Sequence, residues 1–390
     1  MFSVILNKNE EKEKLEGFPW IFNNEVNSFV GEIKDGDICK VLTFDHKFLA
    51  YGFFNLTSKI MVRILSLDEN DVIDEAFFYK RLEDAINYRK SLDLNDSNCM
   101  RLVFSEADFI PGLIVDKYAD YLCIQISSLG LSKKKEWIIN SLVKLLNPKG
   151  IYERSDMASL EKEGMDAYVG PIYNEFNPKV LVVENGIKFY VDMENGQKTG
   201  YFLDQKYNRD NIKHYCKGKD VLDLFSNVGG FALNAAKNKA SSVTALDISN
   251  LACENIKENA KLNGFDNINV ICDDTFNFLR DTNNYNKYDL IVLDPPAFTK
   301  SKETVKKAYR GYKEINLQAI KMIKKNGILM TFSCSQHMTE DLFLQMIKEA
   351  VYDSGRRCMI IDRRIQSPDH PSLISTDVDL YLKSITLRII

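Results

Sequence analysis

The sequence predicts an α/β protein whose C-terminal half is a doubly wound, mostly parallel sheet. From about residue 218 onward, short apolar strands alternate with amphipathic helices. Aspartates stand at the ends of four of these strands, about one βα unit apart: Asp223, Asp247, Asp274 and Asp294. Before residue 190 the pattern is less regular, and a chain of 390 residues is longer than one compact domain usually is. We therefore expect smaller domains ahead of the doubly wound one.

Three domains are predicted, with boundaries near residues 68 and 190. Residues 1–68 should form a small β-rich module, because β-branched and aromatic runs are broken there by Gly-Asp and Asp-His turn signals. Residues 69–190 should form an α+β domain that starts with an amphipathic helix and ends in a hairpin around Asn185-Gly186. Residues 191–390 then hold the doubly wound sheet.

Composition excludes several classes of protein. The net charge of -4 argues against a strongly basic nucleic-acid binder, so any surface for RNA must be local. The eight cysteines are scattered without a C-x-x-C pair, so neither a structural zinc site nor a disulfide framework is expected. No apolar run is long enough for a membrane span, and the charged start differs from a signal peptide, so we expect a cytoplasmic protein. The oligomeric state stays open, and a homodimer is one state the sequence allows.

The acidic strand ends predict a ligand site, because ligands of parallel sheets bind outside the carboxyl ends of the strands. The first turn, "DLFSNVGGF", contains Asn227 and Gly229 but lacks the G-x-G-x-x-G spacing of a dinucleotide site, which disfavours NAD. Asp247 suits the hydroxyls of a ribose, Asp274 an adenine amino group, and Asp223 the cationic end of a ligand. Together they favour S-adenosylmethionine (SAM) as the cofactor.

Two further motifs follow later strands. "DPPAF" at 294–298 has two prolines that stiffen the turn after the fourth strand, and it is interpreted as the part that holds a nucleobase. "GILMTFSCSQHM" at 327–338 places Cys334 where the fifth strand ends. A strand cysteine is usually a buried small hydrophobe, but the polar neighbours at this strand end favour a nucleophile.

These residues resemble a known family. "VLDLFSNVGGF", "LDIS", "YDLIVLDPPAF", "TFSCS" and "GQKTGYFLDQKYNR" (196–209) are similar to class I SAM-dependent methyltransferases of the large-subunit (23S) ribosomal RNA cytosine-5 family. "GFPWIF" resembles the start of their PUA domain and "FIPGLIVDKYADYL" their central domain. The resemblance implies a PUA-like domain, a central α+β domain and a Rossmann-like methyltransferase domain with a seven-stranded sheet. It also implies methyl transfer from SAM to carbon 5 of a cytosine in ribosomal RNA.

The resemblance also assigns site residues. The family's cofactor positions correspond to Asp223, Asn227, Gly229, Asp247, Asp274 and Asp294. Substrate contacts are expected from Lys198, Thr199, Phe202, Asp204, Pro295, Phe298 and Arg310. Arg310 belongs to the basic segment 300–314, in which Tyr309 and Tyr312 could stack on RNA bases. No metal ligand is expected.

Cytosine-5 chemistry would explain Cys334, because carbon 5 is a poor nucleophile until a thiolate adds to carbon 6. Asp294 would then polarise or protonate the ring edge around N3 and N4. Small-subunit relatives carry a second cysteine where this chain has Ala297, so the base that removes the carbon-5 proton is unassigned. Phe332 is expected to pack, and His370 in "SPDHP" is interpreted as structural rather than catalytic. Two alternatives remain: a SAM-dependent N-methyltransferase of an RNA base, and an RNA-binding protein with a degenerate catalytic domain.

Overall fold

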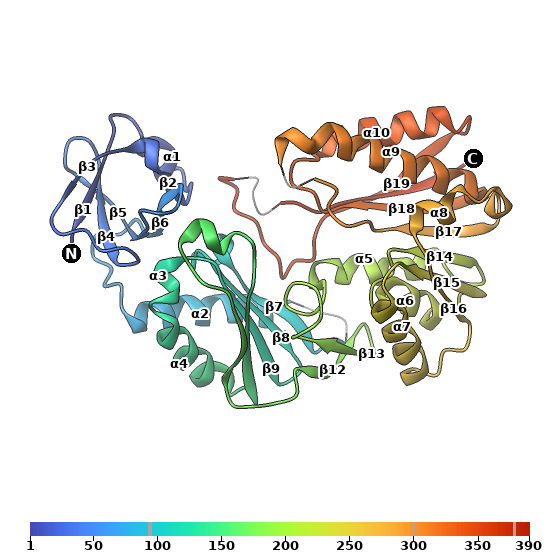
Figure 1. Cartoon of the computed structure of the whole chain (residues 1–390), viewed down its shortest axis with the longest axis horizontal. Helices are drawn as coiled ribbons and strands as arrows, with labels where there is room; N and C mark the ends of the chain where they lie inside the picture. The colour runs from blue at the N-terminus through green and yellow to red at the C-terminus, as the bar shows by residue number, and fades with distance from the viewer. Residues whose placement is uncertain (93–95, 300, 377–379) are drawn as a thin grey trace. The chain divides into compact units, whose positions relative to one another are not determined.

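The computed structural model describes residues 1–92, 96–299, 301–376 and 380–390 (Figure 1). The chain forms two compact units, each of which is described by itself. The first unit comprises residues 1–182, 191–203 and 368–379, and the second comprises 183–190, 204–367 and 380–390. The domain boundaries expected at residues 68 and 190 stay predictions.

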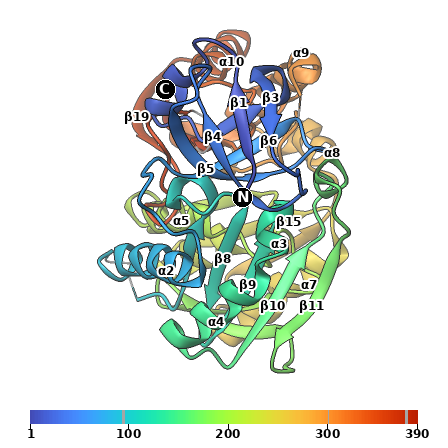
Figure 2. The same ribbon diagram turned by 90° about the vertical axis from the view of Figure 1, so that its left-hand side faces the viewer.

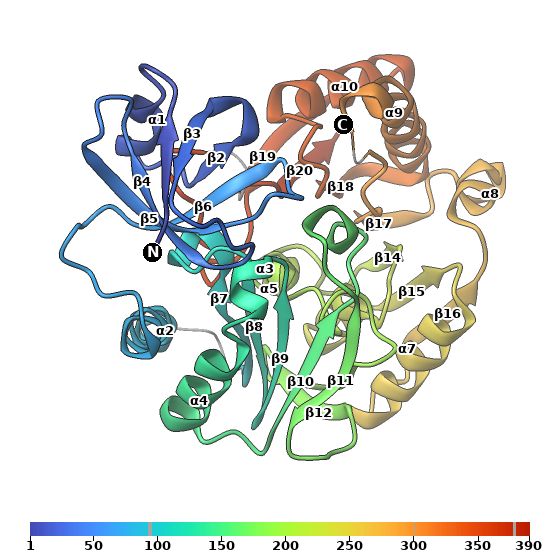
Figure 3. The same ribbon diagram turned by 60° about the vertical axis from the view of Figure 1, so that its left-hand side comes forward.

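The first unit begins with a β-rich module built on a six-stranded sheet in the order β2-β6-β5-β4-β1-β3 (Figure 3). Its strands are β1 (Ser3–Leu6), β2 (Trp20–Phe22), β3 (Val26–Val30), β4 (Ile38–Leu42), β5 (Phe48–Phe54) and β6 (Ile60–Ser66). A short helix, α1 (Glu11–Leu15), follows β1. Alternate residues of β4 and β1, including Val41 and Val4, point into one apolar core, as the period of two in the sequence requires.

A five-stranded sheet in the order β11-β10-β9-β8-β7 follows in the same unit. Its strands are β7 (Cys99–Phe104), β8 (Leu113–Tyr118), β9 (Tyr121–Ile126), β10 (Gly150–Ser155) and β11 (Tyr168–Tyr173), and its helices are α2 (Glu75–Lys90), α3 (Leu129–Ser132) and α4 (Lys135–Leu146). Figure 2 shows α2 and α4 beside this sheet, and their apolar faces share a core with it. Helix α2 begins at Asp74, whose side chain accepts the backbone N–H of Phe77.

The expected hairpin is present as β12 (Lys179–Glu184) and β13 (Ile187–Asp192). Asn185 and Gly186 both have positive φ, at 53° and 67°, which a two-residue type I′ turn requires and which Asn-Gly supplies at low cost. The prediction of a hairpin at this place is confirmed.

The Asp-His turn of "SPDHP" belongs to the first unit. Asp369 is fully buried, and its Oδ2 accepts the backbone N–H of Arg101 at 3.1 Å. Its carbonyl oxygen accepts a hydrogen bond from Arg89 Nη2 at 3.0 Å, and its Oδ1 lies 2.8 Å from His370 Nδ1. The structural interpretation of His370 is thereby supported, because the imidazole is buried beside Phe104.

The second unit contains the predicted seven-stranded sheet, in the order β16-β15-β14-β17-β18-β20-β19. Its strands are β14 (Asp220–Leu224), β15 (Ser242–Asp247), β16 (Ile268–Cys272), β17 (Tyr288–Leu293), β18 (Ile323–Ser333), β19 (Cys358–Arg364) and β20 (Lys383–Ile389). The first five strands in this order, β16, β15, β14, β17 and β18, are parallel to one another. Strand β20 runs antiparallel to its two neighbours, β18 and β19. Strand order reverses between β14 and β17, which is where ligands of such sheets bind. The predicted fold class is confirmed.

Helices cover both faces of this sheet (Figure 1). They are α5 (Lys206–Asn211), α6 (Gly230–Lys237), α7 (Asn250–Leu262), α8 (Thr275–Arg280), α9 (Val305–Met322) and α10 (Glu340–Asp353). Successive residues of β17 take opposite sides: Val292 packs with α6 and α7, and Leu293 packs with α9 and α10. Phe332 lies 5.2 Å from Phe231 between ring centroids, which confirms that it packs. Within the described ranges, no helix combines the length and the apolar character that crossing a membrane requires.

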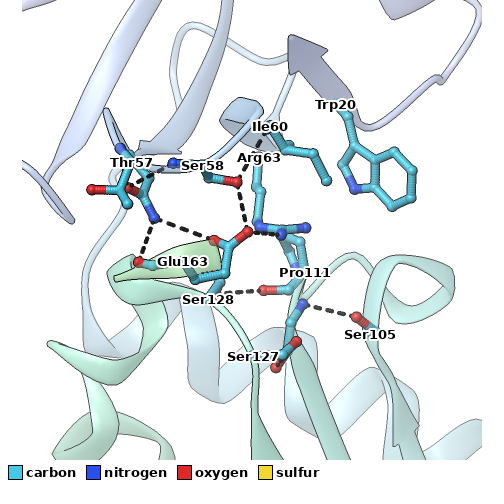
Figure 4. A network of polar contacts seen from close by, with 12 residues as sticks. Trp20, Thr57, Ser58, Ile60, Arg63, Ser105, Pro111, Ser127, Ser128 and Glu163 are labelled. Atoms are coloured by element: carbon cyan, nitrogen blue, oxygen red, sulfur yellow. Dashed lines mark hydrogen bonds and ion pairs between the residues drawn. The ribbon is translucent and has the colours of Figure 1, made fainter. Parts of the chain in front are cut away.

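A polar network joins the β-rich module to the central sheet within the first unit (Figure 4). Arg63 of β6 reaches Glu163 at 2.8 Å and Glu106 at 3.3 Å, and all three side chains are about nine-tenths buried. Ser58 donates its hydroxyl to Glu163 at 2.6 Å, and Trp20 Nε1 donates to Glu106 at 2.9 Å. Since a buried carboxylate is costly without a partner, Arg63 compensates both acids.

Replacing Arg63 by methionine should lower the free energy of unfolding of the first unit by about 3–5 kcal/mol, because two buried carboxylates lose their cation. Urea unfolding followed by tryptophan fluorescence measures this, since both tryptophans, Trp20 and Trp137, lie in the first unit. Lys80→Met, which removes an exposed ion pair with Asp84, is the control and should leave the transition in place. Equal transitions for the two variants would show that the buried network does not stabilise the unit.

Candidate functional site

The site forms at the carboxyl edge of the sheet in the second unit. The parallel register pairs Leu224 of β14 with Leu293 of β17, and Leu293 with Thr331 of β18. Asp294 directly follows β17 and Cys334 directly follows β18. Strands β14 and β17 end at the same level and β18 runs on to Ser333, two residues past Thr331. The two residues and the loop after β14 therefore lie along one edge of the sheet, as the sequence predicts.

The loop after β14 holds the glycine turn. Asn227 and Gly229 have positive φ, at 53° and 88°, and Gly229 caps α6. A Cβ at Gly229 would come within 3.3 Å of the Ile256 side chain and would also be strained by the backbone. Asp247, at the end of β15, accepts the backbone N–H of Asn227 at 2.9 Å, so the second strand end is tied to this turn.

Asp223, near the end of β14, is buried and incompletely satisfied. Its Oδ2 accepts the Ser226 hydroxyl at 2.5 Å and the Ala232 backbone N–H at 3.0 Å. Its Oδ1 is also buried and has no hydrogen-bond partner among the described residues. Burial, and then the charge of Asp247, raises the pKa of Asp223 to about 7. A buried carboxylate oxygen of this kind calls for a cationic or N–H ligand group.

Asp294 is the second strand-end acid with a raised pKa. Burial raises this pKa to about 7, and the charges of Asp204 and Asp223 add to the effect while Arg209 opposes it. Gln205 Nε2 donates to Asp294 Oδ1 at 3.0 Å and fixes the orientation of the carboxyl group. At neutral pH a substantial fraction of Asp294 is therefore protonated, so it can donate a proton as well as accept one.

Asp204 stands beside these acids and is itself buried. Its Oδ2 accepts the Tyr381 hydroxyl at 2.6 Å. Arg209 lies one turn further along, but it makes a bidentate pair with Glu184, at 2.6 and 2.8 Å. Because Glu184 engages the guanidinium, Arg209 only partly offsets the acids around Asp294.

Cys334 is half-buried at the end of β18, between two buried serines. The turn is held by polar contacts: Tyr312 and Ser335 share a hydroxyl hydrogen bond of 3.0 Å, and Lys383 Nζ donates to the Ser335 carbonyl oxygen at 2.7 Å. Five other cysteines are buried: Cys39, Cys99, Cys123, Cys216 and Cys253. Cys334 therefore differs from an ordinary core cysteine in both its exposure and its polar setting.

Asp274 has a role in the fold itself. It caps α8, where its Oδ1 accepts the backbone N–H of Asn277 at 3.0 Å. The side chain is only partly buried, and a contact to an adenine amino group stays a prediction.

The predicted substrate loop divides between the two units. Asp204 belongs to the second unit, and Lys198, Thr199 and Phe202 belong to the first. Thr199 is buried there and donates its hydroxyl to Asp116 Oδ2 at 2.6 Å, which anchors the loop to the central sheet. Lys198 is exposed, with its ammonium 5.0 Å from the centre of the Phe202 ring. Of these three, Lys198 is the exposed group.

One expectation for the basic segment is wrong. Tyr312 was expected to stack on RNA, but it is fully buried, because its position on α9 faces the sheet together with Ala308 and Ile315. Phe298 packs on it, with 4.6 Å between ring centroids. Arg310 lies on the exposed face of α9.

The remaining residues of the "DPPAF" motif and of the basic segment 300–314 lie in different environments. Pro295 is buried behind the strand end, and Tyr309 packs partly on the core below α9. Lys313 pairs with Glu349 and Asp353, at 3.2 and 2.9 Å. Lys300 lies outside the described residues.

Comparisons with known proteins agree with this geometry. A family model described as S-adenosylmethionine-dependent methyltransferase matches residues 172–379, more than half of the chain, and one described as PUA-like domain matches residues 4–67. Proteins named ribosomal RNA large subunit methyltransferase I from Klebsiella pneumoniae (strain 342) and Escherichia coli (strain SMS-3-5 / SECEC) are both 37% identical over 391 residues. These alignments cover 99% of this chain and 98% and 99% of the two relatives.

The chain belongs to the S-adenosylmethionine-dependent methyltransferase family. A candidate SAM-dependent methyltransferase from Streptococcus mutans shares the fold of this methyltransferase with a TM-score of 0.83 at 20% identity, covering 100% of both chains. A further structure, a candidate methyltransferase in complex with SAH, has a TM-score of 0.85 at 21% identity with the same coverage. The resemblance found in the motifs is thus confirmed, and the first module is PUA-like.

The cofactor of the methyltransferase is S-adenosylmethionine. The residues at the strand ends fit it: the unsatisfied Oδ1 of Asp223 suits its ammonium group, and Asp247 lies at the turn where a ribose would be held. Asn227 and Gly229 would let the backbone approach the ligand closely. We expect these contacts when SAM is bound.

Several residues of the site were missed from the sequence. Gln205, Arg209 and Glu184 set the environment of Asp294, and Lys383 lies beside the turn that carries Cys334. A signal was present for the first two, because Gln205 and Arg209 fall in the 196–209 motif at i,i+4 spacing, which places them on one helical face. Lys383 had a weaker signal, a lysine at the start of the strand "KSITLRI", in which polar and apolar residues alternate.

Asp223→Asn should change how stability depends on pH. A carboxyl whose pKa rises on folding favours the folded state at low pH, and this contribution is lost as pH rises from the ordinary 3.8 to about 7. The amide keeps an oxygen for Ser226 and Ala232 and has no charge to bury. Relative to wild type the variant should therefore gain stability between about pH 4 and about pH 8, by about 1.4 kcal/mol for each pKa unit of the shift.

Urea unfolding of the cofactor-free protein, followed by circular dichroism, measures this difference. Asp266→Asn, at an exposed position of the same unit, is the matched control and should run parallel to wild type. A constant difference between Asp223→Asn and wild type across that pH range would contradict the raised pKa.

Proposed function

We propose that the protein methylates carbon 5 of a cytosine in large-subunit ribosomal RNA, with Cys334 as the covalent nucleophile. The observation that carries this proposal is the position of a half-buried thiol on the same sheet edge as Asp294, a carboxyl whose pKa is raised by burial. The choice of RNA is supported by the names of the relatives that are 37% identical over 99% of the chain. Such a substrate agrees with the cytoplasmic location expected from the sequence.

The chemistry makes use of both residues. The Cys334 thiolate adds to carbon 6 of the cytosine, while Asp294 gives its proton to N3, so the ring becomes an enamine with a nucleophilic carbon 5. SAM, when bound, supplies the electrophilic methyl group. After carbon 5 is methylated, it loses its proton, N3 returns its proton to Asp294, and the carbon–sulfur bond breaks to release the thiolate.

The target cytosine must leave its stack to reach the strand ends, and such enzymes extrude the base. Pro295 and Phe298 would shape the rigid turn beside it, and Asp204 would contribute to its polar edge. Arg310, exposed on α9, and Lys198, exposed in the first unit, would contact RNA phosphates. Thr199 and Phe202 would keep the loop that carries Lys198 in shape.

Cys334→Ala should abolish methylation and covalent trapping. With SAM and ribosomal RNA that contains 5-fluorocytidine, wild type should give a protein–RNA band on a denaturing gel, because fluorine blocks the final elimination. Cys272→Ala, at an exposed cysteine of the same unit, is the matched control and should keep the band. Methylation of unmodified RNA that survives Cys334→Ala would instead indicate an N-methyltransferase without covalent catalysis.

Asp294→Asn should remove a pH limb from the methylation rate. If the protonated acid is required, the wild-type rate falls above about pH 7 as Asp294 ionises. The amide cannot transfer a proton, so we expect a rate about 10²–10⁴-fold lower that no longer falls in this range. Asp289→Asn, near the opposite end of β17, serves as the control for strand packing. If the methylation rate of Asp294→Asn still falls above about pH 7, a titratable group other than Asp294 causes the decrease.

A further inference from the structure

Lys383 holds the chain on both sides of Cys334. It is the first residue of β20, and the antiparallel register places it opposite Ser333 of β18. Its Nζ reaches past that pair and donates to the carbonyl oxygen of Ser335 at 2.7 Å. The ammonium therefore lies against the short turn that presents the thiol.

The titratable groups around Lys383 come from three other elements, α10, β19 and α9. Glu340 of α10 faces it but also pairs with Arg363 of β19 at 3.5 Å, and Arg364 of β19 pairs with Asp362 at 2.6 Å. Glu340, Arg363, Arg364 and Lys383 line a hollow of about 240 Å³, through which water can exchange protons with the amine. On the α9 side, burial raises the pKa of Tyr312 and keeps its phenol neutral.

The titration of Lys383 agrees with this placement. Burial lowers the pKa of Lys383 to about 8, and the interactions with Cys334 and Glu340 oppose that decrease. A lysine in this range can take a proton from a thiol and, once charged, stabilise the thiolate it leaves.

We propose that Lys383 is the positioning residue that activates Cys334, by accepting the thiol proton and then holding the thiolate as an ion pair. This role rests on the proposed function, because it gives the pair the task of attacking carbon 6. The amine becomes an ammonium as the S–H bond breaks, and the sulfur electron pair then forms the bond to carbon 6. When that bond breaks at the end of the cycle, the thiolate returns to the same ammonium. The carbon-5 proton goes to water, because Lys383 is already protonated.

The test is the pH dependence of Cys334 alkylation in the full chain without RNA. Iodoacetamide reacts with thiolates, so its rate between about pH 5.5 and about pH 9 titrates the thiol, and mass spectrometry of the Cys334 peptide isolates this site. Lys383→Gln should raise the thiol pKa by about one unit and slow alkylation near pH 6.5 about tenfold. Lys383→Arg keeps the charge and should retain most of the wild-type rate at that pH.

Two controls separate this effect from misfolding. Lys324→Gln removes a lysine near the opposite end of β18, where it pairs with Asp220 and Asp289, and should not change the Cys334 titration. Alkylation of the exposed Cys272 in the same samples should be equal in every variant if the fold is intact. If the Cys272 rate is altered in Lys383→Gln, Lys383→Arg is compared with wild type instead. Because the arginine keeps the positive charge, a thiol pKa of Cys334 that is higher in Lys383→Arg than in wild type would overturn the role of Lys383.

The outcomes also separate this inference from the proposed function. If Lys383→Gln titrates like wild type while Cys334→Ala abolishes methylation, the role of Lys383 is overturned and cytosine-5 chemistry stands. If the titration shifts as expected but Cys334→Ala still methylates RNA, the proposed function fails and the ion pair stands without its task. A matching shift of the methylation rate profile towards higher pH in Lys383→Gln, with rescue by Lys383→Arg, supports both.

Discussion

The parallel pairing of β14, β17 and β18 is the constraint on which the site depends. Because each strand is buried on both faces by helices, its positions for function are at its ends, and the parallel register brings those ends to one edge of the sheet. This explains why Asp223 is fully buried and Asp294 is half-buried even though both belong to strand ends or loops. Their burial produces the raised pKa values, so the chemistry of the edge follows directly from the packing of the sheet.

Three acids meet at this edge of the sheet. The charges of Asp204 and Asp223 act on Asp294, and Arg209, which opposes them, also pairs with Glu184. A cluster of acids favours a cationic ligand, and SAM carries both an ammonium and a sulfonium. Burial, with the charges of Asp204 and Asp223 adding to it, raises the pKa of Asp294 to about 7, so it keeps a proton at a pH where an exposed aspartate would have lost it. Binding of the cofactor and proton transfer to the nucleobase thus both depend on the same cluster of acids.

The sequence predicted the elements of this site better than their surroundings. Strand ends, the Asn-Gly hairpin and the glycine turn are local features, so residues such as Asp247 and Asn185 could be placed from pattern alone. Tyr312 was misjudged because its side of α9 depends on how the helix packs, which a basic composition does not reveal. Lys383 was missed because it meets the Cys334 turn only through the antiparallel pairing of β18 with β20, some 50 residues apart in sequence. Tertiary partners of this kind leave little trace in a single sequence.

The Asp-His turn at residues 369–370 has a consequence for how the protein is made. The first unit takes most of its mass from residues 1–182, yet Asp369 accepts hydrogen bonds from the Arg89 side chain and from the backbone N–H of Arg101. On the ribosome, the N-terminal sheets can collapse early, but their last buried contacts wait until nearly the whole chain has been translated. A fragment that ends after the first domains would leave those arginines without this partner, and a fragment of the C-terminal half would carry an Asp-His turn with nothing to bury it. The first unit is therefore completed only after most of the second unit has been translated.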